Sequence, residues 1–165
     1  QGERTLRRAR AGNVGQVPVK KVITPVDLRT WPTPLDHSTV VVEATIPVEP
    51  VSKQRARVAV GGRGQRFYTP SQTTEAEFVT GLIIKQEAPD LCVDDESDFG
   101  VRALFFSSTR HRRDLDNMLK LLMDSATGLV WKDDTQVLEI NARRLFDREN
   151  PRTEFILHRL EEVAK

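Results

Sequence analysis

Several features that mark familiar protein classes are scarce or missing in this sequence. The single cysteine, Cys92, excludes a disulfide within the chain and is typical of a protein that works in a reducing interior. The three histidines, His37, His111 and His158, lie far apart, so neither a zinc finger nor a histidine-based metal nuclease is expected. No apolar run approaches the roughly 20 residues that a membrane span needs, and no secretory signal is visible. We therefore expect a cytoplasmic protein without membrane contact.

The chain also lacks a strong net charge. Its formal charge is +1 at pH 7, which does not indicate a polyanionic partner for the molecule as a whole. The charge is unevenly spread, because residues 1–38 hold seven Lys or Arg against three Asp or Glu, whereas residues 39–165 hold 18 against 21. Any binding to nucleic acid must therefore depend on local basic patches and on bound metal.

Residues 1–38 are expected to form a basic arm in front of a single folded domain over residues 39–165. Arginines cluster at the front of the arm, glycines follow, and Pro25, Pro32 and Pro34 interrupt any regular structure. Two interpretations stay open. The arm is either a solvated, partly disordered tail or a basic segment that lies along DNA phosphates.

The domain itself shows alternating strand and helix patterns. Runs of β-branched and apolar residues predict strands over residues 40–46, 100–106, 135–145 and 153–160, the last of which is also compatible with a helix. Helical spacing appears over residues 71–86, with Phe78 and Leu82 among its apolar positions, and over residues 115–126. A loop or ragged hairpin is expected over residues 49–66. This pattern predicts an α/β (α+β) fold with a small mixed sheet and two main helices.

Five aspartates and one lysine lie close together, directly after the basic run at residues 110–113. The polar residues of this segment are Asp114, Asp116, Asn117, Lys120, Asp124, Asp133 and Asp134. At about 100° per residue, those from Asp116 to Asp124 share one polar stripe of the predicted helix, with Asp114 at its N-cap. Because side chains alternate along a strand, one of the adjacent aspartates before residue 135 is expected to face that helix.

Carboxylates that converge repel one another, and a divalent metal is the usual counter-charge. Oxygen ligands suit Mg²⁺ or Mn²⁺, which lower the pKa of a bound water and neutralise charge on phosphate oxygens. A lysine one turn away would position the phosphate. With the adjacent basic run, the pattern predicts a metal-dependent nuclease. The alternative is an exposed helix with Asp116 and Lys120 as an ordinary ion pair, which leaves Asp133 and Asp134 unexplained at a strand.

The central motif reads Asp-Leu-Asp-Asn-x-x-Lys-x-x-x-Asp, followed by Trp-x-Asp-Asp-x-Gln. It resembles the central motif of the RusA family of phage and prophage Holliday-junction resolvases. Residues 46–57 resemble the family's opening strand and basic loop, and Tyr68-Thr69-Pro70 resembles the start of its first helix. Val48 stands where the family often has glycine. The resemblance covers approximately residues 40–160 and leaves the arm out.

This resemblance implies a homodimer, encoded by a phage or prophage, that binds four-way DNA junctions inside a bacterial cell. It also implies that the protein needs Mg²⁺ or Mn²⁺ and uses no small-molecule cofactor. By motif match, Asp114, Asp116 and Asp134 would bind the metal, and Lys120 would be the catalytic lysine. Asp133 would join the catalytic group, and a supporting role would fall to Asn117 and Asp124.

Two basic segments are candidate DNA contacts. The first contains Lys53, Arg55 and Arg57, which are spaced two residues apart. In an extended segment these side chains would share one face along the DNA backbone. The second precedes the metal-binding helix, where cations would grip the phosphates that flank the cut or would merely offset the aspartates. The candidates are Lys53, Arg55, Arg57, Arg110, His111, Arg112 and Arg113.

We therefore expect an endonuclease that resolves Holliday junctions and other branched DNA by Mg²⁺-dependent hydrolysis. One alternative is a metal-dependent nuclease that prefers flaps or replication forks. Another is a non-catalytic DNA-binding module of phage replication or packaging.

Overall fold

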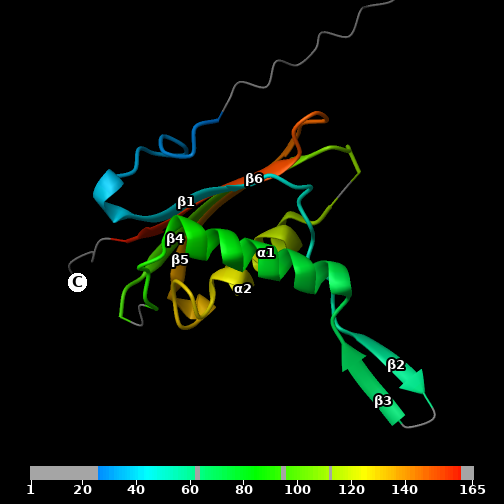
Figure 1. Cartoon of the computed structure of the whole chain (residues 1–165). Coiled ribbons are helices and arrows are strands. Elements are labelled where there is room, and N and C mark those ends of the chain that lie inside the picture. Colours follow the sequence, from blue (N-terminus) through cyan, green and yellow to red (C-terminus); the bar gives the residue numbers. More distant parts are fainter. Residues whose placement is uncertain (1–25, 62–63, 94–95, 112, 161–165) are drawn as a thin grey trace, which may run out of the picture.

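A computed structural model describes residues 26–61, 64–93, 96–111 and 113–160. Its centre is a four-stranded mixed sheet in the order β1-β6-β4-β5, with both long helices on one face (Figure 1). The elements are β1 (Val40–Ile46), α1 (Ser71–Glu87), β4 (Phe99–Ser107), α2 (Leu115–Ala126), β5 (Val137–Phe146) and β6 (Arg152–Arg159). This α+β architecture confirms the predicted fold class.

The predicted elements lie close to their expected positions. The segment at residues 153–160, for which a helix was also considered, is the strand β6. The basic segment after Pro50 leads into a hairpin of β2 (Arg57–Gly61) and β3 (Gly64–Tyr68), which extends away from the main sheet (Figure 1). No helix in the described part of the chain combines the length and apolar character that crossing a membrane requires.

The pairing of the strands decides where the chain can bring polar residues together. β4 is buried along its whole length and pairs with β6 in antiparallel and with β5 in parallel orientation. In the parallel pair, Phe99 lies opposite Val137 at one end and Ser107 lies opposite Phe146 at the other. Because β4 and β5 run the same way, the connection between them must return the chain along the whole length of the sheet. α2 makes most of that return.

The main core lies between the sheet and the two helices. Alternate residues of the strands point toward the helices, as Val42, Ala44 and Ile46 do on β1. They pack with Ile84 from α1 and with Met118, Leu122, Ala126 and Trp131 from α2 and the turn after it. The apolar stripe that predicted α2 therefore faces the sheet, and its polar stripe faces away.

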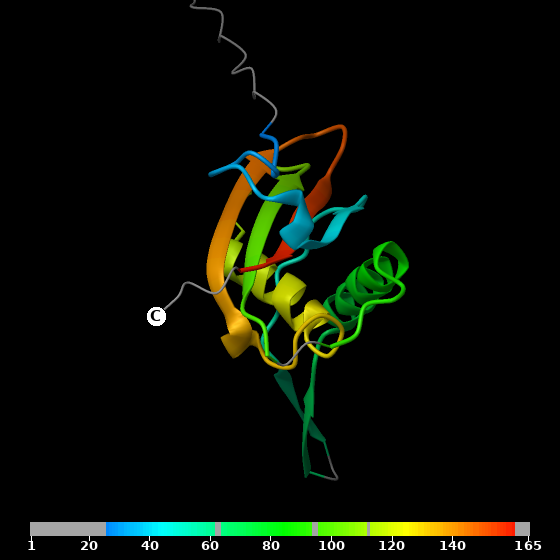
Figure 2. The same ribbon diagram turned by 90° about the vertical axis from the view of Figure 1, so that its left-hand side faces the viewer.

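A second core covers the opposite face of the sheet (Figure 2). Residues 26–35 lie there, with Leu28 and Trp31 packed near Leu104 and Ile156. The buried Arg102 donates hydrogen bonds to three carbonyl oxygens of this segment, those of Leu28 (3.2 Å), Trp31 (2.8 Å) and Thr33 (2.5 Å). This part of the expected arm thus packs on the domain, while residues 1–25 lie outside the described residues, and the proposed division of the chain stays a prediction.

Candidate functional site

The first two aspartates of the motif lie at the N-terminal end of α2. Asp114 occupies the N-cap position in an extended conformation, as expected, but its side chain makes no capping hydrogen bond to the helix backbone. Its Oδ2 instead accepts a hydrogen bond from Asn117 Nδ2 at 3.3 Å. Asp114 and Asp116 are both exposed. Two carboxylates are therefore accessible at a helix end whose backbone N–H groups favour anions.

Lys120 and Asp124 continue the polar stripe of α2. Lys120 Nζ lies 3.7 Å from Asp124 Oδ1, so Asp124 is its i,i+4 partner. The alternative interpretation of the sequence had paired Lys120 with Asp116 instead. The Lys120 side chain remains 57% exposed, whereas that of Asp124 is 25% exposed. The weak, solvated pair leaves the ammonium of Lys120 able to reach a phosphate on the same face as Asp116.

Lys53 connects three separate parts of the fold. Its ammonium forms ion pairs with Asp124 on α2 and with Glu77 on α1, the latter at 2.9 Å. Its backbone N–H donates to the carbonyl of Asn117 at 3.0 Å. Burial opposes the charged form, but the hydrogen bonds that the ammonium donates to Asp124 and Glu77 outweigh it and raise the pKa of Lys53 above its usual value. The lysine that was predicted to contact DNA thus has structural partners within the protein.

The other basic candidates whose side chains the structure describes fall into two groups. Arg113 forms an ion pair with Glu49 at 3.1 Å and donates to the carbonyl of Pro50, so it also fastens the loop before Lys53. Arg55, Arg110 and His111 are exposed on the surface. Arg112 and the side chain of Arg57 lie outside the described residues. Contact of these residues with DNA stays a prediction.

The second aspartate pair lies in a short 3₁₀ turn, η2 (Asp134–Gln136), and not in the strand that follows it. Asp133 caps this turn: its Oδ1 accepts from the Thr135 N–H at 3.0 Å, and this hydrogen bond lowers the pKa of Asp133. The Gln136 side chain accepts from the Asp133 N–H at 3.2 Å and donates to the Ser97 carbonyl at 3.0 Å. The turn is thereby fixed beside the start of β4, with Asp134 exposed.

One chain does not bring all of these acids together. The guanidinium of Arg144, near the end of β5, donates to the carbonyls of His111 and Arg113 at 3.1 Å each and holds the segment before Asp114 there. Asp134 precedes the other end of β5. Seven residue steps of strand separate Val137 from Arg144, or about 23 Å. The expectation that an aspartate of the second pair faces the polar stripe of α2 beside Asp116 is therefore not met within one chain.

The separation of these acids decides whether a single chain can hold a metal ion. No group of three or more His, Cys, Asp or Glu side chains that could hold a metal ion occurs among the described residues. Asp114 and Asp116 offer the hard oxygen ligands that Mg²⁺ prefers, but within one subunit the third acid lies at the far end of the sheet. The described part of a single chain thus supplies an incomplete ligand set.

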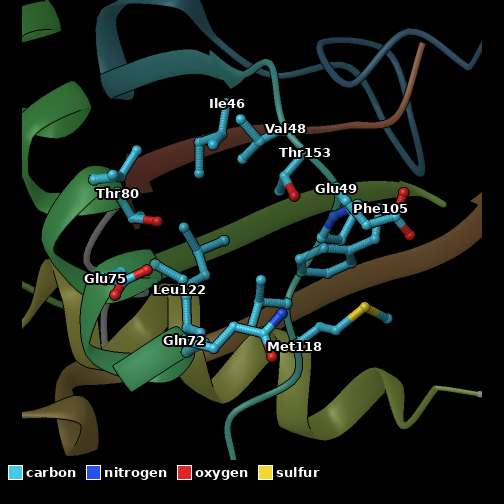
Figure 3. Close-up of a pocket in the computed structure, with 15 residues that line it drawn as sticks. Ile46, Val48, Glu49, Gln72, Glu75, Thr80, Phe105, Met118, Leu122 and Thr153 are labelled. Carbon is cyan, nitrogen blue, oxygen red and sulfur yellow. The ribbon is translucent and has the colours of Figure 1, made fainter. Parts of the chain in front are cut away.

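An apolar cavity that the sequence did not reveal lies on the other side of α2. It has a volume of about 270 Å³ and is lined by both helices, the end of β1 and the segment after it (Figure 3). Met118, Leu121 and Leu122 face it from α2, whereas Asp116 and Lys120 lie on the opposite side of that helix. The cavity therefore lies on the opposite side of α2 from Asp116 and Lys120.

Comparison with known proteins adds an independent finding. A protein-family model described as "Endodeoxyribonuclease RusA" matches residues 47–157, which is more than half of the chain. The match includes every candidate site residue, from Lys53 to Asp134. No curated protein matches the chain.

Proposed function

Since the chain belongs to the RusA family of endodeoxyribonucleases, we propose that it resolves Holliday junctions and other branched DNA by metal-dependent hydrolysis of phosphodiester bonds. The family implies Holliday-junction resolution in general. The observation that supports this activity here is the pair of exposed carboxylates, Asp114 and Asp116, at the N-terminal end of α2 within the matched region. A helix end of this kind attracts a phosphate, and the carboxylates supply ligands for a metal beside it.

The proposed cofactor is Mg²⁺ or Mn²⁺, on which RusA resolvases generally depend. Asp114, Asp116 and Asp134 are the proposed ligands. When bound, such an ion supplies charge neutralisation at the phosphate and an activated water. We propose that Asn117 fixes the orientation of Asp114, to which it donates a hydrogen bond at 3.3 Å.

Lys120 is the proposed catalytic lysine. It lies one turn after Asp116 on the same stripe, and its side chain is mostly exposed. Its contact with Asp124, at 3.7 Å, is weak enough for the ammonium to turn toward a phosphate that binds beside Asp116. Asp124 itself is held by Lys53, so this aspartate has a positioning role that depends on the fold around it.

The proposed partners are branched DNA and a second copy of the chain. Arg55, Arg110 and His111 are exposed and would contact phosphates, which position DNA without reading its sequence. A four-way junction has two-fold symmetry, and a C2 dimer presents two identical sites to it. We propose that the protein acts in the cytoplasm of a bacterium and that a phage or prophage encodes it.

A cleavage assay with synthetic substrates tests this function. The protein is incubated with a four-way junction, a linear duplex, a flap and a fork of matched sequence, each with Mg²⁺ or with a chelator. We expect cleavage of the junction only when Mg²⁺ is present. Preferential cleavage of the flap or fork would instead identify the alternative nuclease. Junction binding without cleavage of any substrate would identify a non-catalytic module.

A further inference from the structure

The first residue of α2 is held in place without help from its N-cap side chain. An aspartate at an N-cap usually accepts a hydrogen bond from a backbone N–H of the first turn, which fixes both the helix start and the carboxylate. Asp114 makes no such bond, and its side chain is exposed. Other contacts must therefore set the direction in which the chain enters α2.

Arg113, directly before Asp114, is anchored through its side chain and through its backbone. Its guanidinium forms an ion pair with Glu49 at 3.1 Å and donates a hydrogen bond to the carbonyl of Pro50. Its own carbonyl accepts a hydrogen bond from the guanidinium of Arg144, also at 3.1 Å. Glu49 belongs to the loop after β1, whereas Arg144 belongs to β5. The peptide that leads into Asp114 is thus fixed from two separate parts of the fold.

The carboxylate of Glu49 is itself held in one orientation. Its Oε2 accepts a hydrogen bond at 3.0 Å from the N–H of Ser108, the residue after β4. Its Oε1 is shielded from solvent and lies on the side of Arg113. Glu49 also lines the apolar cavity, so part of its surroundings is apolar (Figure 3). The carboxylate is therefore fixed more firmly than one in a solvated surface pair.

We propose that Glu49 is a positioning residue for Asp114 and that it acts through Arg113. By fixing the guanidinium of Arg113, it fixes the peptide from which the Asp114 side chain extends, while that side chain stays free of the helix backbone. This role rests on the proposed function, in which Asp114 binds a metal ion beside the phosphate to be cut. Removing a group that orients a metal-binding side chain typically costs about 10- to 100-fold in metal affinity or activity.

This role separates Arg113 from the other basic residues that precede α2. Arg110 and His111 are exposed, whereas the Arg113 side chain is 31% exposed and already contacts a carboxylate and a carbonyl oxygen. A cation that is paired within the protein must give up that pair before it can bind a DNA phosphate. Arg113 is therefore assigned to holding Asp114, and contact with DNA is left to the exposed members of the run.

Glu49→Gln tests this role, because glutamine keeps an acceptor for the Ser108 N–H but removes the charge that holds Arg113. The Mg²⁺ concentration for half-maximal junction cleavage should rise by roughly 10- to 100-fold. Junction binding in the presence of a chelator should not weaken. The matched control is Glu43→Gln, which removes an ion pair with Arg29 on the face of the sheet opposite α2. The Glu43 side chain is 39% exposed and that of Glu49 is 30% exposed, so both variants should lose similar stability, but only Glu49→Gln should need more Mg²⁺.

Amide hydrogen exchange at Met118 gives a second measurement that needs neither DNA nor metal. The Met118 N–H donates to the carbonyl of Asp114 at 3.2 Å, so its exchange reports on how firmly Asp114 is held. Exchange should be faster in Glu49→Gln and unchanged in Glu43→Gln. If the wild-type protein cuts no junction but this difference appears, only the proposed function is contradicted. If the wild-type protein cuts junctions and Glu49→Gln keeps the wild-type Mg²⁺ requirement, the proposal is wrong, whatever the exchange at Met118. Unchanged exchange in a protein that does not cut would also overturn it.

Arg113→Lys distinguishes positioning from contact with DNA and serves as the test if Glu49→Gln does not fold. Lysine keeps the positive charge but lacks the planar fork that contacts Glu49 and the Pro50 carbonyl together. We expect the Mg²⁺ requirement to rise as in Glu49→Gln, with an unchanged salt slope of junction binding, and the double variant to be no worse than either single one. A wild-type Mg²⁺ requirement in Arg113→Lys would overturn the proposal. So would tighter junction binding by Glu49→Gln with a salt slope steeper by about one, because Arg113 would then be a DNA contact that Glu49 restrains.

Discussion

Replacing Lys53 with methionine distinguishes a structural role for this lysine from a role in binding DNA. Methionine keeps the length of the apolar stem and removes the charge. In the wild-type protein the side chains of Lys53, Asp124 and Glu77 are each only 25–28% exposed, so the substitution leaves two partly buried carboxylates without their cation. Leaving these carboxylates without the cation costs about 1–3 kcal/mol of unfolding free energy. For a chain of this length, each kcal/mol lowers the melting temperature by roughly 2–4 °C.

The assay combines thermal unfolding with junction binding at several salt concentrations. Arg55→Met is the matched control, since Arg55 is an exposed neighbour on the same loop. We expect Lys53→Met to lower the melting temperature and Arg55→Met to leave it unchanged but weaken DNA binding. Adding Asp124→Asn to Lys53→Met should recover part of the lost stability, because it removes one uncompensated charge. A Lys53→Met protein that melts like the wild type, with the salt slope of DNA binding reduced by about one, would refute this reasoning.

Three further outcomes are expected. Asp116→Asn should abolish junction cleavage while binding stays intact or becomes tighter, as measured by gel shift, because a repulsive charge near the DNA is removed. Lys120→Ala should reduce the cleavage rate strongly but cost only about 0.2–0.5 kcal/mol of stability in the same preparation, the value of an i,i+4 pair. The hydrogen bond from the Thr135 N–H lowers the pKa of Asp133 below its usual 3.8, so its contribution to stability is complete above that pH and is lost as the pH falls through the lowered pKa. Asp133→Asn should remove this acid-dependent contribution in unfolding curves measured from pH 5 to pH 2.

The parts of the structure that depend on local patterns were predicted well. The β-branched run at residues 40–46 predicted a strand and forms β1. The apolar spacing of residues 115–126 predicted a helix, which is α2 with Asp114 at its N-cap. The same spacing places Asp116 and Lys120 on the exposed side of that helix. These features follow from the periods of a strand and a helix, which the sequence expresses directly.

The parts that depend on distant contacts were not predicted. Asp134 lies far from Asp116 because β4 and β5 pair in parallel, and no local pattern specifies that pairing. Lys53 meets Asp124 across 71 residues of sequence, so a basic loop residue looked available for DNA. Phe78 has helical spacing yet lies in solvent, because spacing identifies a helix but not which of its faces another element covers.

The second face of the sheet gives a further example. Residues 26–35 contain prolines and precede the first strand, which is typical of an arm. Their few apolar side chains nevertheless fill this face, and a single buried arginine, Arg102, satisfies three of their carbonyls. A segment without regular structure can be part of a core when one side chain provides its hydrogen bonds.

Metal-dependent resolution of a four-way junction is tested most directly with a supercoiled plasmid that extrudes a cruciform. A cruciform is a four-way junction within a closed circle. Two cuts in symmetry-related strands convert this plasmid to a linear molecule, whereas a single cut gives only a nicked circle. We predict a linear product that requires Mg²⁺, depends on the cruciform and is absent with Asp116→Asn. Nicked circles alone, or linear product from a plasmid without the cruciform, would contradict it.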